Sequence, residues 1–96
     1  MNISIRDKVK RIIDLAVDFN DSETRQDVTG SKPTVFVDFC GHTCQLNVSI
    51  HRKGYDSWED RFSNTVYLDQ SGAIEKLNEI INVLEKTIAA WLASDT

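Results

Sequence analysis

The residues best able to do chemistry lie together in the middle of the chain. Cys40, His42 and Cys44 fall within one short segment, and His51 follows it. Thiolates and imidazoles are the usual zinc ligands, so this cluster suggests a metal site. Its spacing differs from that of standard zinc sites, where cysteines flank a turn and a distant second pair follows. Strand alternation also separates Cys44 from Cys40 and His51 on opposite faces of a sheet. We therefore expect neither a metal nor another cofactor.

Other uses of the two cysteines meet similar difficulties. Side chains on opposite sheet faces cannot bring their β-carbons to about 3.8 Å, which argues against a Cys40–Cys44 disulfide. A Cys40 nucleophile needs a cation or a helix N-terminus to lower its pKa, and the sequence places neither beside it. The scattered glycines form no phosphate-binding pattern. We predict that the chain is not an enzyme, and keep a metal or thiol protein built on this hairpin as an alternative.

Apolar spacing predicts a helix near each end of the chain. The first runs from about Ile5 to Phe19 after an N-cap at Ser4, with apolar residues at intervals of three and four. The second runs from Gly72 to about Ala93 and repeats this spacing. A stripe this wide is typical of a helix packed on a core. The second stripe consists of Ile74, Leu77, Ile81, Leu84, Ile88 and Trp91, widened by Ile80 and Leu92.

Three strands are predicted between the helices, at Thr34–Cys40, from Thr43 to about Arg52, and at Asn64–Asp69. The order contains no parallel crossover, so an antiparallel meander is the simplest sheet. We predict an α+β fold, α-β-β-β-α, with a three-stranded antiparallel meander and both helices packed on one face. Residues 1–96 would form a single domain, with residues 20–32 as a polar, flexible loop.

The hairpin register follows from the alternation. Val35, Val37 and Phe39 should share the buried face of the first strand. Pairing Phe39 with Cys44 leaves Gly41 and His42 as a two-residue turn. A glycine at the first turn position is the signature of a type II′ hairpin.

Aromatic residues and arginine are enriched in binding hot spots, and two groups of them stand out. The connection before the third strand carries Tyr55, Trp58, Arg61 and Phe62. The alternative is that Trp58 and Phe62 close one end of the core. Phe36 and Tyr67 are expected on the open face of the sheet, where they could meet across strands. We take these six residues as candidates for protein binding.

Charge and hydropathy exclude several classes of protein. The net charge is −4, so attraction to phosphates is not favoured over the molecule as a whole, although a local basic patch stays possible, and nucleic acid is not an expected partner. Apolar runs are shorter than the roughly 20 residues of a membrane span, and no apolar leader follows Met1. Two cysteines are too few for a disulfide-stapled secreted fold. We expect a cytoplasmic protein without membrane association.

The acidic residues suggest a second function. In length and α+β character the chain is similar to small accessory and counter-defence proteins of phages and mobile elements, which implies an inhibitor that imitates nucleic acid. The carboxylates that would imitate phosphates are Asp18, Asp21, Glu23, Asp27, Asp56, Glu59 and Asp60. The leading prediction remains a non-catalytic protein-binding or accessory module with a protein partner, and a homodimer is one form of it.

Overall fold

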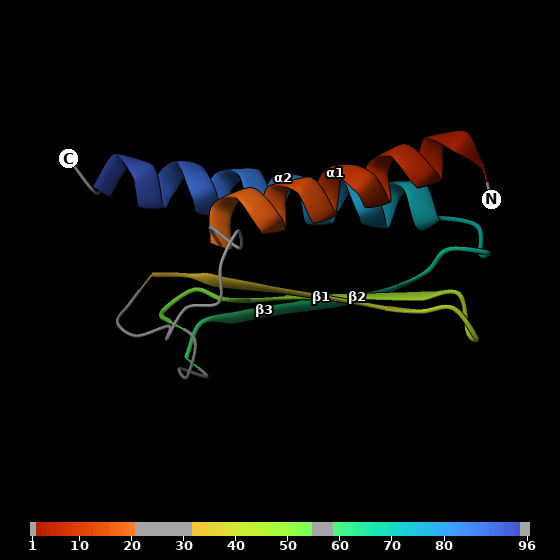
Figure 1. Ribbon diagram of the computed structural model, residues 1–96, viewed down its shortest axis with the longest axis horizontal. Coiled ribbons are helices and arrows are strands. Elements are labelled where there is room, and N and C mark those ends of the chain that lie inside the picture. The colour runs from red at the N-terminus through yellow and green to blue at the C-terminus, as the bar shows by residue number, and fades with distance from the viewer. Residues whose placement is uncertain (1, 21–31, 55–58, 95–96) are drawn as a thin grey trace.

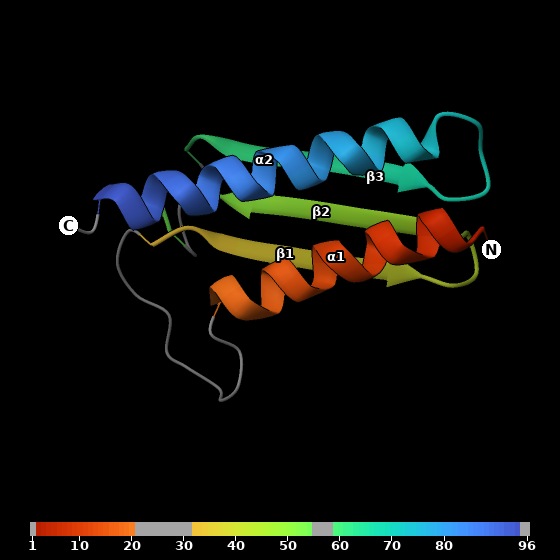
Figure 2. The ribbon, with the colours of Figure 1, turned by 90° about the horizontal axis from the view of Figure 1, so that it is seen from above.

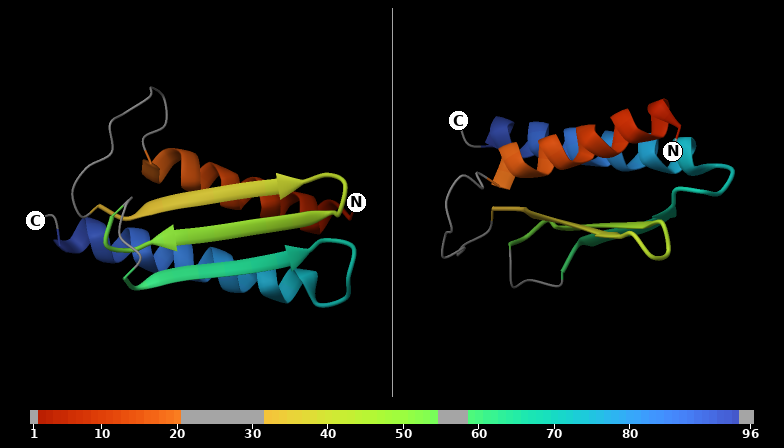
Figure 3. Two further views of the ribbon diagram at one scale, coloured as in Figure 1. Left: turned by 90° about the horizontal axis from the view of Figure 1, so that it is seen from below. Right: turned by 45° about the vertical axis from the view of Figure 1, so that its right-hand side comes forward.

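Two helices cover one face of a three-stranded sheet (Figure 1). The computed structural model describes residues 2–20, 32–54 and 59–94 of the chain. The elements are α1 (Ile3–Asn20), β1 (Thr34–Cys40), β2 (Gln45–His51), β3 (Arg61–Tyr67) and α2 (Ala73–Ser94). The strands are antiparallel in the order β1-β2-β3, which confirms the predicted α-β-β-β-α fold. Seen from below, the other face of the sheet carries neither helix (Figure 3).

The N-cap of α1 is Asn2, two residues earlier than predicted. The Asn2 side-chain oxygen accepts a hydrogen bond from the Ser4 N–H at 2.7 Å. The Asn2 carbonyl accepts the first helical bond, from the Arg6 N–H at 3.0 Å. Asparagine is a strong N-cap residue because its side chain satisfies a helical N–H that has no partner within the helix.

The core lies between the helices and the sheet. β2 contributes alternate residues, as its sequence predicted, and α2 contributes Ile80 together with part of the predicted stripe. Leu92 is 61% exposed, contrary to expectation, because α2 extends past the end of the sheet there (Figure 2). The core residues are Ile12, Ala16, Phe19, Val35, Leu46, Val48, Ile50, Val66, Leu68, Ala73, Leu77, Ile80 and Leu84.

The predicted register of the β1–β2 hairpin is wrong by two residues. Cys40 pairs with Gln45, and Phe39 with Leu46, so residues 41–44 form a four-residue turn. Cys44 closes this turn at a φ of 56°, in the left-handed region. Because side chains alternate with a period of two, this shift leaves each strand residue on its predicted face.

β3 begins earlier than predicted and ends earlier as well. Its first residue, Arg61, pairs with His51, so β3 runs alongside the whole of β2. Beyond its last residue, the Leu68 N–H donates to the Cys44 carbonyl at 2.9 Å. Gly72, at a φ of 86°, then turns the chain into α2.

Asn20 ends α1 and fastens it to β1. It was predicted to open the polar loop, whose other positions up to residue 31 lie outside the described residues. The Asn20 amide nitrogen donates to the Val35 carbonyl at 2.8 Å, and its oxygen accepts from the Val35 N–H at 3.1 Å. The side chain thus pairs with the edge of β1 as a neighbouring strand would.

Asn20→Ala should lower the free energy of unfolding by about 1–2 kcal/mol. Two hydrogen bonds are lost, and the Val35 N–H and C=O are left without their side-chain partner. Chemical denaturation measures this change. Hydrogen exchange should accelerate at the Val35 amide beyond the change seen at Val48, which reports global opening. Equal protection of Val35 in the variant and the parent protein would contradict the role given to Asn20.

Candidate functional site

Exposed apolar side chains gather on α1 and β1. Ile13 and Val17 are 41% and 46% exposed on α1, and Phe39 is 50% exposed on β1. Ile3 and Phe36 lie on the same two elements and are also exposed. We call Ile13, Val17 and Phe39, together with the outer edge of β1, the α1–β1 edge surface. Contiguous exposed apolar surface is uncommon on monomeric proteins, so these positions are the ones to examine as a candidate interaction surface.

Ile13 and Val17 overhang the edge of β1. They precede Asn20 by seven and three residues, which places all three on one flank of the helix. Because Asn20 bonds to the outer edge of β1, this flank faces past that edge. Figure 2 shows the C-terminal end of α1 lying beyond β1.

Phe39 is exposed because α1 does not cover its end of β1. Its position on β1 places it on the helix-covered face, as predicted, yet its ring is half exposed. The N-terminal half of α1 crosses toward β2 and leaves the end of β1 uncovered (Figure 2). The surface therefore has an overhanging apolar helix flank at one end of β1 and an uncovered apolar ring at the other.

The backbone along this edge is set up for pairing. In an antiparallel sheet the N–H and C=O of one residue point to the same side, and that side alternates along the strand. Val35 bonds outward to Asn20, so Val37 and Phe39 also point outward. Phe36 and Asp38 point toward β2. No described residue outside the strand is seen to bond the outward groups of Val37 and Phe39.

The open face of the sheet does not bring Phe36 and Tyr67 together. Phe36 pairs with Ser49 and Tyr67 with Gln45, and the two aromatics lie on different edge strands. The Phe36 ring instead packs on His51, with centroids 4.6 Å apart and planes tilted by 50°. The expected cross-strand aromatic patch is therefore absent from these two positions. His51, on the open face of the sheet as predicted, is buried there.

Polar side chains occupy the open face between these aromatics. The Thr65 hydroxyl donates to Asn47 Oδ1 at 2.7 Å, and Gln45 Nε2 donates to the same atom at 3.2 Å. Ser49 and Ser63 bond across the strands at 3.3 Å. These groups bond to one another, so this part of the open face, over β2 and β3, offers a partner few unsatisfied polar groups.

The four remaining residues predicted to bind a protein do not lie together in the described structure. Phe62 packs against the core, which matches the structural alternative for it. Arg61 is exposed on β3, opposite His51. Tyr55 and Trp58 lie outside the described residues.

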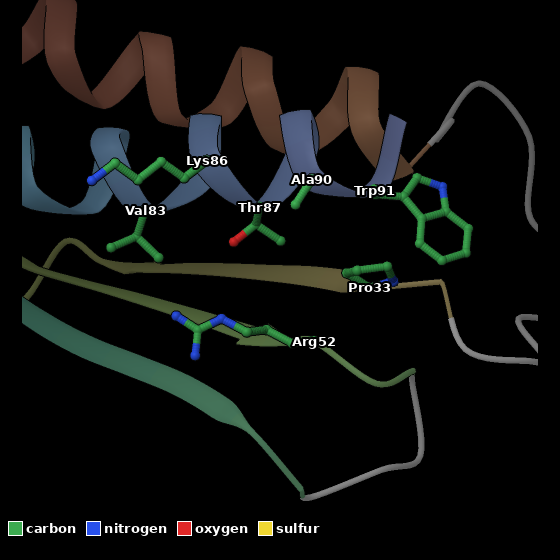
Figure 4. Close-up of a pocket in the computed structure, with 7 residues that line it drawn as sticks. All are labelled: Pro33, Arg52, Val83, Lys86, Thr87, Ala90 and Trp91. Carbon is green, nitrogen blue, oxygen red and sulfur yellow. The ribbon is translucent and has the colours of Figure 1, made fainter. Parts of the chain in front are cut away.

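A cleft of about 430 Å³ opens beneath the C-terminal half of α2 (Figure 4). Arg52 is held there by the chain itself, since it contacts Asp60 at 3.0 Å and lies 5.8 Å from the Phe62 ring centroid. We therefore assign the cleft no ligand. It is lined by Pro33, Arg52, Val83, Lys86, Thr87, Ala90 and Trp91.

Two of the carboxylates expected to imitate phosphates are instead paired with basic side chains of the chain itself. Asp60 binds Arg52, and Glu59 lies 3.5 Å from Lys53. Of the other five, only Asp18 is described. Within residues 2–20, 32–54 and 59–94, no three metal-ligating side chains gather as a metal site requires. Neither α1 nor α2 has the length and apolar composition of a bilayer-spanning helix.

The turn after β1 lowers the pKa of the Cys40 thiol. The Thr43 hydroxyl contributes most, followed by the backbone N–H groups of Thr43 and His42, all donating toward sulfur. Partial burial and Asp38 oppose this shift without reversing it. Sequence reasoning missed this shift because the donors, the Thr43 hydroxyl and two backbone N–H groups, belong to a turn whose length was mispredicted. Cys40 and Cys44 are both free thiols.

Comparisons with protein families, curated proteins and solved structures find no match to this chain.

Thr43→Val should slow the alkylation of Cys40 at pH 7–8. Loss of the hydroxyl donor raises the pKa of the thiol toward its ordinary value, so less thiolate is present and the pH–rate curve moves to higher pH. The measurement is the iodoacetamide rate against pH, with tandem mass spectrometry assigning the label to Cys40. Thr65→Val, which removes a hydroxyl from β3 rather than from the turn, is the matched control. Superimposable profiles for all three proteins would refute this cause.

Proposed function

We propose that this chain is a non-catalytic protein-binding module whose partner binds the α1–β1 edge surface. The observation that supports it most directly is the position of Ile13, Val17 and Phe39 beside an edge strand with outward backbone groups. Apolar contacts and main-chain hydrogen bonds are then both available along one edge strand. This combination is typical of surfaces that bind another chain.

The expected binding energy is modest. Fully burying one such side chain is worth about 1.5–3 kcal/mol, and roughly half of each is still exposed. The sum for Ile13, Val17 and Phe39 is about 2–4 kcal/mol, which association costs largely offset. Backbone pairing along β1 must supply the rest. We therefore expect reversible binding with an accessory or regulatory character.

A second copy of the chain, forming a homodimer, is the alternative partner to be tested at this surface. A two-fold dimer requires the same patch on both subunits, and it would place an overhanging helix flank of one over the uncovered Phe39 of the other. Nucleic acid remains disfavoured by the net charge of −4.

Ile13→Glu and Phe39→Ser should each abolish capture of the partner. The experiment is a low-salt pull-down from native lysate, read by mass spectrometry, then repeated with the purified partner. A charge at Ile13 or a lost ring at Phe39 removes the apolar contact, and since both side chains are exposed the fold should persist. Light scattering at several concentrations tests the homodimer.

Tyr67→Ser is the matched control, because Tyr67 is similarly exposed but lies on β3. Its capture should equal that of the parent chain. A partner that binds all three variants equally well places the binding site elsewhere, and a partner lost only with Tyr67→Ser moves it to the β3 side.

A further inference from the structure

We propose, on the basis of this protein-binding function, that the partner adds a short antiparallel strand to the edge of β1. That strand carries a basic residue opposite Asp38, with an apolar residue on each side of it. The occupant is thus an extended segment of a different protein, with the pattern apolar–basic–apolar.

The hydrogen-bonding positions on β1 define the length of the added strand. Val37 and Phe39 each present an N–H and a C=O outward, which gives four backbone bonds to a facing antiparallel strand. The next outward position toward the N-terminus is Val35, and Asn20 already occupies it. The paired segment is therefore centred on Asp38 and short.

Side chains of the added strand would point alternately to the helix-covered face and to the open face of the sheet, and these two faces differ in character. Partner residues opposite Val37 and Phe39 direct their side chains to the helix-covered face, because directly opposed residues share a face. There they meet the exposed Phe39 ring and the overhanging flank of Ile13 and Val17. Apolar side chains suit both positions.

The central residue of the added strand meets a carboxylate. Asp38 lies on the open face, is exposed, and has no ion pair with any described residue. A residue directly opposite it has its Cα about 4.5 Å away, since Asp38 belongs to a non-hydrogen-bonded pair on this side. Opposite charges at such a position stabilise a strand pair and like charges destabilise it. Lysine or arginine is the complementary residue.

The same carboxylate disfavours a second copy as the occupant. A two-fold pairing that uses both Val37 and Phe39 places Asp38 directly opposite the Asp38 of the second copy. If the two-fold axis of the dimer passed beside Val37, pairing would need the Val35 N–H and C=O, which already bond to Asn20. If the axis passed beside Phe39, Val37 of one copy would face Gly41 of the other, and Gly41 lies in the turn. Each self-pairing thus meets a repulsion or loses backbone bonds.

The β3 edge is a poorer site by the same criteria. The bond from Leu68 to Cys44 shows that even-numbered β3 residues point toward β2, so the outward backbone positions are odd-numbered. In the described strand these are Arg61, Ser63, Thr65 and Tyr67. Arg61 repels a basic residue. The N-terminal half of α2 extends beyond β3 (Figure 2), but that half of the helix exposes no large apolar side chain comparable to Ile13 or Val17.

The test is an NMR titration of the ¹⁵N-labelled full chain with a capped seven-residue peptide. Its central lysine is flanked on each side by isoleucine, threonine and serine. A second peptide carries glutamate in place of the lysine, and a third is N-methylated at both isoleucines, which removes two strand-pairing donors. The lysine peptide should shift the amides of Val37, Phe39 and Ile13 and slow hydrogen exchange at Val37 and Phe39. It should bind about threefold to tenfold more tightly than the glutamate peptide, and the N-methylated peptide should lose binding.

The Asp38→Lys variant supplies the reciprocal control, because it should reverse the preference between the lysine and glutamate peptides. Equal binding of all three peptides at these amides would overturn strand addition but leave a protein-binding surface. Strand addition also fails if no peptide binds while a captured partner is lost with Ile13→Glu. If capture is insensitive to Ile13→Glu and Phe39→Ser, the proposed function fails as well.

Discussion

The pair of hydrogen bonds between the Asn20 side chain and the Val35 backbone is the constraint that shapes the α1–β1 edge surface. It fixes the end of α1 beside the outer edge of β1 rather than above the middle of the sheet. Since α1 is straight and crosses the strands at an angle, anchoring one end outside β1 carries the other end inward (Figure 2). The exposure of Ile13 and Val17 and that of Phe39 are therefore two consequences of one anchor.

The same anchor determines which backbone groups are accessible. It shows that odd-numbered residues of β1 point outward, and the antiparallel ladder extends this alternation to β2 and β3. The bond from Leu68 to Cys44 agrees with it independently at the far end of the sheet. A side-chain contact at one residue thus specifies the hydrogen-bonding pattern of the whole edge.

The sequence predicted the fold because its main determinants are local. Period-two alternation in β2 and intervals of three and four in the helices are visible in the residues themselves. The hairpin turn was mispredicted because Cys44 adopts a left-handed φ that cysteine rarely favours, and this allows a longer turn than Gly41 and His42 suggested. The exposure of Phe39 depends on the crossing of α1 over the sheet, a tertiary feature that alternation cannot reveal. The pKa of Cys40 depends on the same turn and was missed with it.

Edge strands expose unpaired backbone groups, and natural sheets protect them against indiscriminate pairing. β1 combines two protective devices: Asn20 covers Val35, and Asp38 places a charge at the centre of the exposed stretch. Neither device covers Val37 or Phe39. A charge that repels a copy of itself also attracts an opposite charge, so under the proposed strand addition, protection against self-association and selection of a basic partner strand would be the same electrostatic interaction with opposite sign. An edge protected by a lysine would exclude its own copies equally well but would favour an acidic strand, so in this proposal the identity of residue 38 would decide which partner strands β1 accepts.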